Sequence, residues 1–187
     1  MAGSGLARLS GIALAAVLAA AAVAASAGGP PDVAVEATYL YKFAPFVTWP
    51  DAAATRPFTI CVVGDDPFGP LLDRAVAGQT LSTPSGPRPI QVTHIDTIGA
   101  HSSCDIAYLG GSRAESVAEA LRAVRGAPIL TVTDEDDPPG IIAFAVADGH
   151  VRFRIDQAQA QQNGLVISSK LLSLALVVRD ADGKVLP

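Results

Sequence analysis

Two serines and a lysine within residues 163–172 are the side chains of this chain whose types most resemble a catalytic pair. Ser168 and Ser169 stand directly before Lys170. A serine nucleophile and a lysine base need a spacing of three, because residues three or four apart share one face of a helix and closer ones do not. The spacings here are two and one. We therefore interpret Ser168 or Ser169 as a helix cap, and Lys170 as a solvated or partner-facing charge.

Two glycine-containing turns are the next candidates, for binding an anion. Gly110 and Gly111 lie between an expected strand and an expected helix, where backbone N–H groups could bind an anion. The stretch is not a GxGxxG fingerprint, and a tight strand-to-helix turn is the alternative. The turn after the first strand contains Asp65 and Asp66, which would repel a phosphate.

Possible metal ligands are present but do not form a known pattern. Residues 134–140 contain four carboxylates without the ligand spacing of an EF-hand. His101 and Cys104 have the spacing of half a zinc site, and no second half follows. We predict no catalytic residue, no metal and no cofactor, and hence a protein that is not an enzyme.

The elements that would position these residues alternate between strands and helices. Residues 83–89 are expected to be a loop because of their prolines, and Asp148-Gly149 predicts a tight hairpin. Expected strands cover residues 58–63, 90–95, 105–109, 128–133, 141–146 and 150–155. Expected helices cover residues 33–47, 68–76, 113–124, 156–163 and 168–178. This order predicts an α/β, Rossmann-like fold: a mainly parallel sheet flanked by helices, with a C-terminal antiparallel hairpin at the edge.

The first residues have the pattern of a secretory signal peptide. Arg8 is followed by a short apolar run and by Ala25-Ser26-Ala27, a small-x-small cleavage site. The run is short for a membrane span, which needs roughly 20 residues; an uncleaved anchor is the alternative. We predict a signal peptide at residues 1–27, one domain at 28–180 and a polar tail at 181–187, and so an exported, periplasmic protein.

Charge and cysteine content fit that compartment. The formal net charge is −5 and no basic run occurs, which argues against nucleic-acid binding. Cys61 and Cys104 are the two cysteines of the chain. An even count in an exported protein favours a disulfide between them, with two buried free thiols as the alternative.

The segment from residue 39 to residue 49 is rich in aromatic side chains. Because residues 39–43 point all round a helix, we expect that one core cannot bury them all and that some contact a partner. A helix wholly buried between the sheet and the last helix is the alternative. The predicted partner-binding residues are Tyr39, Tyr41, Lys42, Phe43, Trp49 and Lys170.

Four blocks of sequence resemble one known family. They are VEATYLYKFAPFVTWP at residues 35–50, ICVVGDDPFGPLLD at 60–73, CDIAYLG at 104–110, and residues 126–178, which contain VRFRI and GLVISSKLL. In this order they are similar to the YfiR family of small exported proteins, and the resemblance covers nearly all of the chain after residue 27. It implies a Rossmann-like fold, a homodimer, no enzymatic activity and a bridge between Cys61 and Cys104. A second family disulfide has no counterpart here.

The same resemblance implies how the protein works. Members are periplasmic repressors of a membrane-bound diguanylate cyclase, whose sensor domain they bind and whose cyclic di-GMP output they lower. An outer-membrane lipoprotein can sequester them. A periplasmic small-molecule sensor or carrier, using the Gly110-Gly111 turn or a crevice at the sheet edge, is the alternative function.

Overall fold

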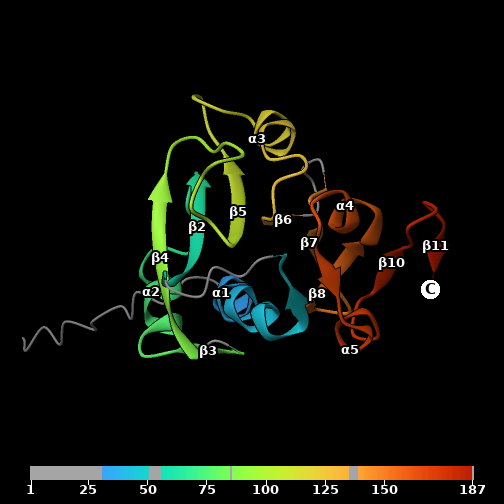
Figure 1. Cartoon of the computed structure of the whole chain (residues 1–187), viewed down its shortest axis with the longest axis horizontal. Helices are drawn as coiled ribbons and strands as arrows, with labels where there is room; N and C mark the ends of the chain where they lie inside the picture. The colour runs from blue at the N-terminus through green and yellow to red at the C-terminus, as the bar shows by residue number, and fades with distance from the viewer. Residues whose placement is uncertain (1–30, 51–55, 85, 135–138, 187) are drawn as a thin grey trace, which may run out of the picture.

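A computed structural model describes residues 31–50, 56–84, 86–134 and 139–186 (Figure 1). The helices are α1 (Pro31–Phe43), the 3-10 turn η1 (Ala44–Phe46), α2 (Pro70–Val76), α3 (Val117–Ala123), α4 (Gln157–Gln162) and α5 (Ser169–Leu172). The strands are β1 (Val47–Thr48), β2 (Phe58–Gly64), β3 (Thr80–Thr83), β4 (Gly86–Ile95), β5 (Ile106–Gly111), β6 (Leu130–Thr133), β7 (Ile142–Ala147), β8 (His150–Asp156), β9 (Val166–Ile167), β10 (Val177–Arg179) and β11 (Val185–Leu186).

Nine of these strands form one sheet in the order β11-β10-β8-β7-β6-β5-β2-β4-β3. The run from β4 through β2, β5 and β6 to β7 is parallel. Asp148 and Gly149 adopt positive φ angles in the tight turn that pairs β7 with β8 antiparallel. The predicted α/β fold with its mainly parallel sheet and antiparallel hairpin is confirmed, and β10 and β11 extend the sheet beyond the hairpin.

The central strand β2 is buried on both faces because six successive residues of it are apolar or small. Successive side chains on a strand point to opposite faces, so Ile60 and Val62 enter one core while Cys61 and Val63 enter another. The first core also contains residues of α1 and α2: Leu40, Phe43 and Leu72. The second contains residues of α3: Val117 and Ala120. Helices therefore cover both faces of the sheet, as the sequence predicted.

The predicted disulfide is present and lies in the second core. Cys61 on β2 is bonded to Cys104, which precedes β5, with 5.7 Å between their Cα atoms. Both cysteines are buried. The bond joins two strands that are also neighbours in the sheet, so it crosslinks chain segments 43 residues apart at a place where the fold already holds them together.

A buried ion cluster holds the N-terminal ends of β2, β4 and β5. Asp105 and Arg88 are each 4% exposed. The Asp105 carboxylate accepts hydrogen bonds from Arg56 Nη1 and Nη2, both at 2.8 Å, and from Arg88 Nη2 at 3.1 Å. It also accepts from the Thr59 backbone N–H at 2.8 Å. One carboxylate therefore forms ion pairs with a buried and a half-exposed guanidinium.

Aromatic rings pack around this cluster and connect it to the segment after α1. The Arg88 guanidinium lies 5.2 Å from the centre of the Phe58 ring. The Trp49 ring meets Phe58 edge-on at 5.2 Å, and its Nε1 donates to the Asp105 carbonyl at 3.3 Å. The cluster thus fixes Trp49, and with it the end of the η1–β1 segment, against the sheet.

The predicted loop at residues 83–89 is wrong, because these residues belong to the β3–β4 hairpin. Pro87 and Pro89 lie within β4. The Ile90 N–H donates to Gln79 O, so by the alternation of an antiparallel ladder the backbone N of both prolines faces away from β3. Pairing of β4 with β2 begins only at Ile90. Neither proline therefore removes a ladder hydrogen bond.

Several predicted helices extend further than the observed ones. The helix expected at residues 33–47 ends at Phe43, after which the chain forms η1 and β1. The helix expected at residues 113–124 begins at Val117, because Ser116 caps it in a capping box with Glu119. The helix expected at 168–178 ends at Leu172, since Leu176 N donates to Phe153 O and the chain then enters β10. The apolar residues after Leu172 could form a helix or a strand by their pattern alone. Pairing of β10 with β8 makes residues 177–179 a strand.

The disulfide gives a direct stability prediction. We expect no free thiol in denatured, non-reduced protein, and a free energy of unfolding lowered by about 4 kcal/mol on reduction, the loop-entropy value for a loop of this size. Thiol titration and denaturant unfolding with and without reductant measure both. Two titratable thiols in the native, unreduced protein would contradict the structure.

The ion cluster gives a second stability prediction. Asp105→Asn keeps the shape of the side chain but leaves the buried Arg88 without its counter-charge, so we expect unfolding to become easier by about 3–5 kcal/mol. Asp73→Asn removes the same charge from an exposed site on α2 and should change little. Chemical denaturation of both variants provides the comparison. Equal, small effects would show that the cluster contributes nothing beyond net charge.

Candidate protein interface

The structure divides the predicted partner-binding residues of α1 between core and surface. Leu40 and Phe43, three residues apart, lie on one helix face and are buried in the first core. Phe43 is 1% exposed, and its ring packs against Phe144 at a tilt and against Phe153 edge-on. Its predicted place at an interface is therefore corrected: Phe43 is a core residue, because α1 turns this face to the sheet.

Tyr39, Tyr41 and Trp49 are partly buried at the edge of the same core. The Tyr39 ring packs 5.8 Å from Phe153 and 5.9 Å from Phe43. Trp49 is held by the ion cluster described above. These three rings therefore contribute mainly to the fold, and each offers a partner only part of its surface.

Lys42 and Lys170 are exposed, as a partner-facing role requires. Lys170 Nζ lies 5.7 Å from the centre of the Phe46 ring, within the range of a cation–π contact. The Ser168 hydroxyl accepts from the Leu171 N–H, so Ser168 is the N-cap of α5. Ser168 therefore caps the helix while Lys170 contacts Phe46, which agrees with the interpretation of this stretch as a helix start.

A short two-stranded ribbon joins the segment after α1 to the segment before α5. Strand β1 pairs antiparallel with β9, with Val47 opposite Ile167 and Thr48 opposite Val166. The Ser168 N–H donates to Phe46 O at 2.9 Å. Sequence reasoning missed this ribbon. Its signal is two pairs of β-branched residues, each too short to be recognised as a strand beside helical patterns.

Apolar side chains are exposed on and beside this ribbon. Val166 is 65% exposed and Leu174 54% exposed. Leu174 lies in the turn that directly follows α5, the helix that contains Lys170. Together with Phe46 they define what we call the ribbon surface: Phe46, Val166, Lys170 and Leu174. An apolar surface beside a cation is the composition that protein partners bind.

At the Gly110-Gly111 turn two stretches of backbone lie close together. The residue after β2 is hydrogen-bonded to the end of β5: the Asp65 N–H donates to Gly111 O at 2.8 Å. A Cβ atom at Gly110 would collide with the Asp65 carbonyl oxygen. Glycine is therefore needed here for the close approach of two backbones, which is the tight-turn alternative.

At the start of α3, beside that turn, side-chain oxygens already accept hydrogen bonds from the backbone N–H groups. The Ser116 hydroxyl accepts from the Glu119 N–H, and the Glu119 carboxylate accepts from the Ser116 N–H at 2.9 Å. The Ser116 hydroxyl also donates to the Glu119 carboxylate at 2.6 Å, and this bond, together with the one from the Ser116 backbone N–H, lowers the pKa of Glu119. A hollow beside this turn is lined by two carboxylates, Asp65 and Asp96, and by one guanidinium, Arg113, so its net charge does not favour an anion.

The possible metal ligands do not come together. Within the described part of the chain, no group of three or more His, Cys, Asp or Glu side chains could hold a metal ion. Residues 135–138 of the acidic stretch lie outside the described residues. His101 is exposed, and Cys104 is used in the disulfide.

One carboxylate on α1 has an unusual protonation equilibrium. Partial burial, with Asp134 and Asp32 as further negative charges, raises the pKa of Glu36 to about 7. Asp134 is itself oriented by the Tyr108 hydroxyl, which donates to its Oδ2 at 2.8 Å. Ionised Glu36 therefore weakens the contact between α1 and the ends of β5 and β6.

Residues 1–27, the predicted signal peptide, lie outside the described residues. Across the part of the chain that the structure describes, no helix is long and apolar enough to span a membrane.

Comparison with known protein families gives a match over most of the chain. A model of the YfiR/HmsC-like family matches residues 33–176, well over half of the chain. The match runs from α1 to the residue before β10 and so includes both cysteines, the ion cluster and the ribbon surface. No curated protein matches the chain.

The pKa of Glu36 predicts how stability depends on pH. A carboxyl whose pKa is higher in the folded than in the unfolded state binds its proton more tightly when folded, so stability falls as pH rises from about 4.5 to about 7. Glu36→Gln should therefore stabilise the protein by about 1–2 kcal/mol near pH 8, a value reduced for partial exposure. Near pH 4.5 the two proteins should unfold alike. Denaturant unfolding at both pH values checks this, and an equal difference at both would contradict it.

Proposed function

Because the chain belongs to the YfiR/HmsC-like family, we propose that it is a non-enzymatic regulatory protein that binds and represses a membrane-bound signalling enzyme from the periplasm. The proposed enzyme is a diguanylate cyclase, bound through its periplasmic sensor domain, so that binding lowers the output of cyclic di-GMP. The family match is the observation that carries this proposal.

The signal-peptide pattern at residues 1–27 supports the compartment. The disulfide supports it independently, since such bonds persist in oxidising compartments. A repressor in the periplasm meets a membrane enzyme only through domains on that side of the membrane, which favours a sensor domain over the catalytic one as the contact.

The ribbon surface is the proposed contact on this protein. Val166 and Leu174 provide exposed apolar area that the monomer leaves uncovered, and Lys170 provides a cation already positioned over Phe46. A matching partner surface would combine an apolar patch with a carboxylate. Such a contact gains from desolvation at its centre and from charge complementarity at its rim.

Lys42 and the exposed parts of Tyr39, Tyr41 and Trp49 extend the proposed contact along the end of α1. A homodimer and capture by an outer-membrane lipoprotein are further proposed states of the same protein. If the partners share the ribbon surface, sequestration by the lipoprotein would release the cyclase by direct competition.

Deletion and complementation test the function. Loss of the gene should raise cellular cyclic di-GMP, and the wild-type gene should restore the lower level. A deletion strain with an unchanged cyclic di-GMP level would argue against repression of a cyclase.

Point variants test the surface. Val166→Glu should weaken binding to the purified sensor domain by about 2 kcal/mol, roughly 30-fold, because it puts a charge into an apolar contact. Val185→Glu makes the same change at a similarly exposed valine, 56% exposed, on the outermost strand β11, and should bind normally. Both should melt like the wild type. Normal binding by folded Val166→Glu would place the interface elsewhere.

A further inference from the structure

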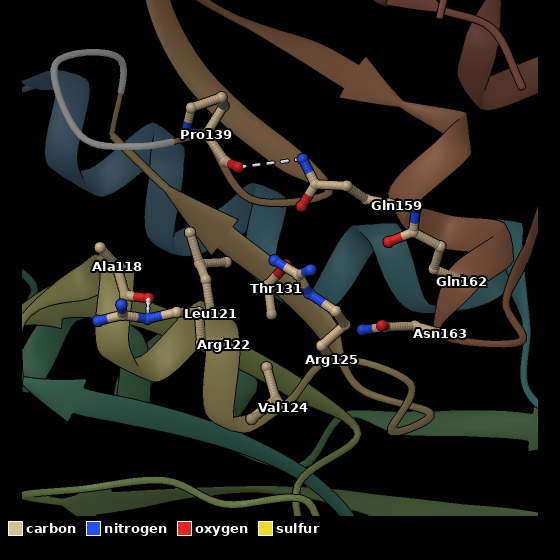
Figure 2. Close-up of a pocket in the computed structure, with 10 residues that line it drawn as sticks. All are labelled: Ala118, Leu121, Arg122, Val124, Arg125, Thr131, Pro139, Gln159, Gln162 and Asn163. Carbon is tan, nitrogen blue, oxygen red and sulfur yellow. Dashed lines mark hydrogen bonds between the residues drawn. The ribbon is translucent and has the colours of Figure 1, made fainter. Parts of the chain in front are cut away.

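A cavity of about 360 Å³ lies on the α3 side of the sheet, between α3 and α4 and above β6 (Figure 2). Its size is at the lower end of the range of small-molecule pockets. The residues that carry the argument are Leu121, Val124, Arg125, Thr131, Gln162 and Asn163. None of them belongs to the ribbon surface or to the closed Gly110-Gly111 turn.

The floor of the cavity is a polar group that is itself buried. On β6, Leu130 and Val132 point into the first core, so Thr131 points to the opposite face. Thr131 is 2% exposed, and its Oγ1 accepts from the Ile141 N–H at 2.9 Å. The hydroxyl donates no hydrogen bond among the described residues, which leaves its proton for a ligand.

The wall formed by α4 is held in place by Asn163. Its Oδ1 accepts from the Gly126 N–H at 2.9 Å, and its Nδ2 donates to Ile129 O at 3.0 Å. Asn163 therefore ties the end of α4 to the turn between α3 and β6. Gln162 also lines the cavity, and its side-chain amide has no partner among the described residues.

Arg125 supplies a positive charge that the fold does not use. Its side chain makes no hydrogen bond or ion pair among the described residues, and Figure 2 shows the guanidinium directed into the space between α3 and α4. Arg122 differs: its Nε donates to Ala118 O at 3.1 Å, and it lies one helical turn from Glu119. In a chain of formal net charge −5, a cation without a partner facing a cavity is a candidate for anion recognition.

The remaining wall is aliphatic. Leu121 and Val124 of the α3 segment line the cavity beside Arg125. A guanidinium binds a carboxylate through two parallel hydrogen bonds, and apolar walls select against a bare inorganic ion. The geometry points to a binding site for a small organic monocarboxylate, with its carboxylate on Arg125 and its short aliphatic body against Leu121 and Val124. This inference goes beyond the proposed function and does not depend on it.

Titration with isocaproate, a branched six-carbon carboxylate, tests the site, with isocaproamide as the uncharged analogue of the same shape. In amide ¹H–¹⁵N spectra of the protein without its signal peptide, isocaproate should shift the signals of Gly126, Thr131 and Gln162 saturably. The expected Kd is about 1 mM or tighter, as a ligand of this size allows. Isocaproamide should bind at least about tenfold more weakly, because it lacks the charge-assisted hydrogen bonds.

Two arginine variants distinguish binding in this cavity from a general effect of the protein's charge. Arg125→Gln should weaken isocaproate binding about tenfold or more while the melting temperature stays unchanged, since the side chain has no partner in the fold. Arg113→Gln removes the same charge from an exposed position before α3 and should bind like the wild type. The absence of saturable shifts, equal binding of the amide, or equal losses in both variants would each overturn the inference.

Discussion

One buried carboxylate determines how the N-terminal half of the sheet is assembled. Asp105 forms ion pairs with Arg88 inside the protein and with Arg56 at its edge, and it also accepts a backbone hydrogen bond from β2. A buried cation is costly unless it is both paired and hydrogen-bonded. The fold must therefore bring β2, β4 and the start of β5 together in one register for the charge to be accommodated. The Phe58 and Trp49 rings pack on the cluster, and this packing also fixes the position of the segment after α1.

That constraint also explains why the aromatic stretch of α1 is mostly structural. Phe43 lies in the core and Trp49 is fixed on the ion cluster, and the segment between them, η1 and β1, also buries Ala44 and Val47. This segment pairs with β9 and leaves Val166, Lys170 and Leu174 facing outward. The surface proposed for partner binding is thus a consequence of how the core is anchored, and its position is rigidly related to the sheet.

Sequence patterns predicted most of the fold because the central strands are nearly continuous apolar runs bounded by glycine. They also predicted the disulfide, a serine cap at the start of α5 and the β7–β8 hairpin. They failed where tertiary pairing overrides local preference. Pro87 and Pro89 are tolerated in β4 because their nitrogens face away from β3, and the residues after Leu172 become a strand because β8 offers an edge. The ribbon, Arg125 and Asn163 needed the three-dimensional arrangement, since no local spacing brings these elements together.

The pairing of Val47 with Ile167 links the two ends of the domain in sequence. Contacts between residues so far apart bear a high loop-closure cost until the intervening sheet has formed. A chain whose C-terminal part has not yet been made has no β9 to pair with, so the ribbon cannot form until nearly all of the domain is present. A surface built in this way is present only on completely folded molecules, so recognition through it would also act as a check on maturation.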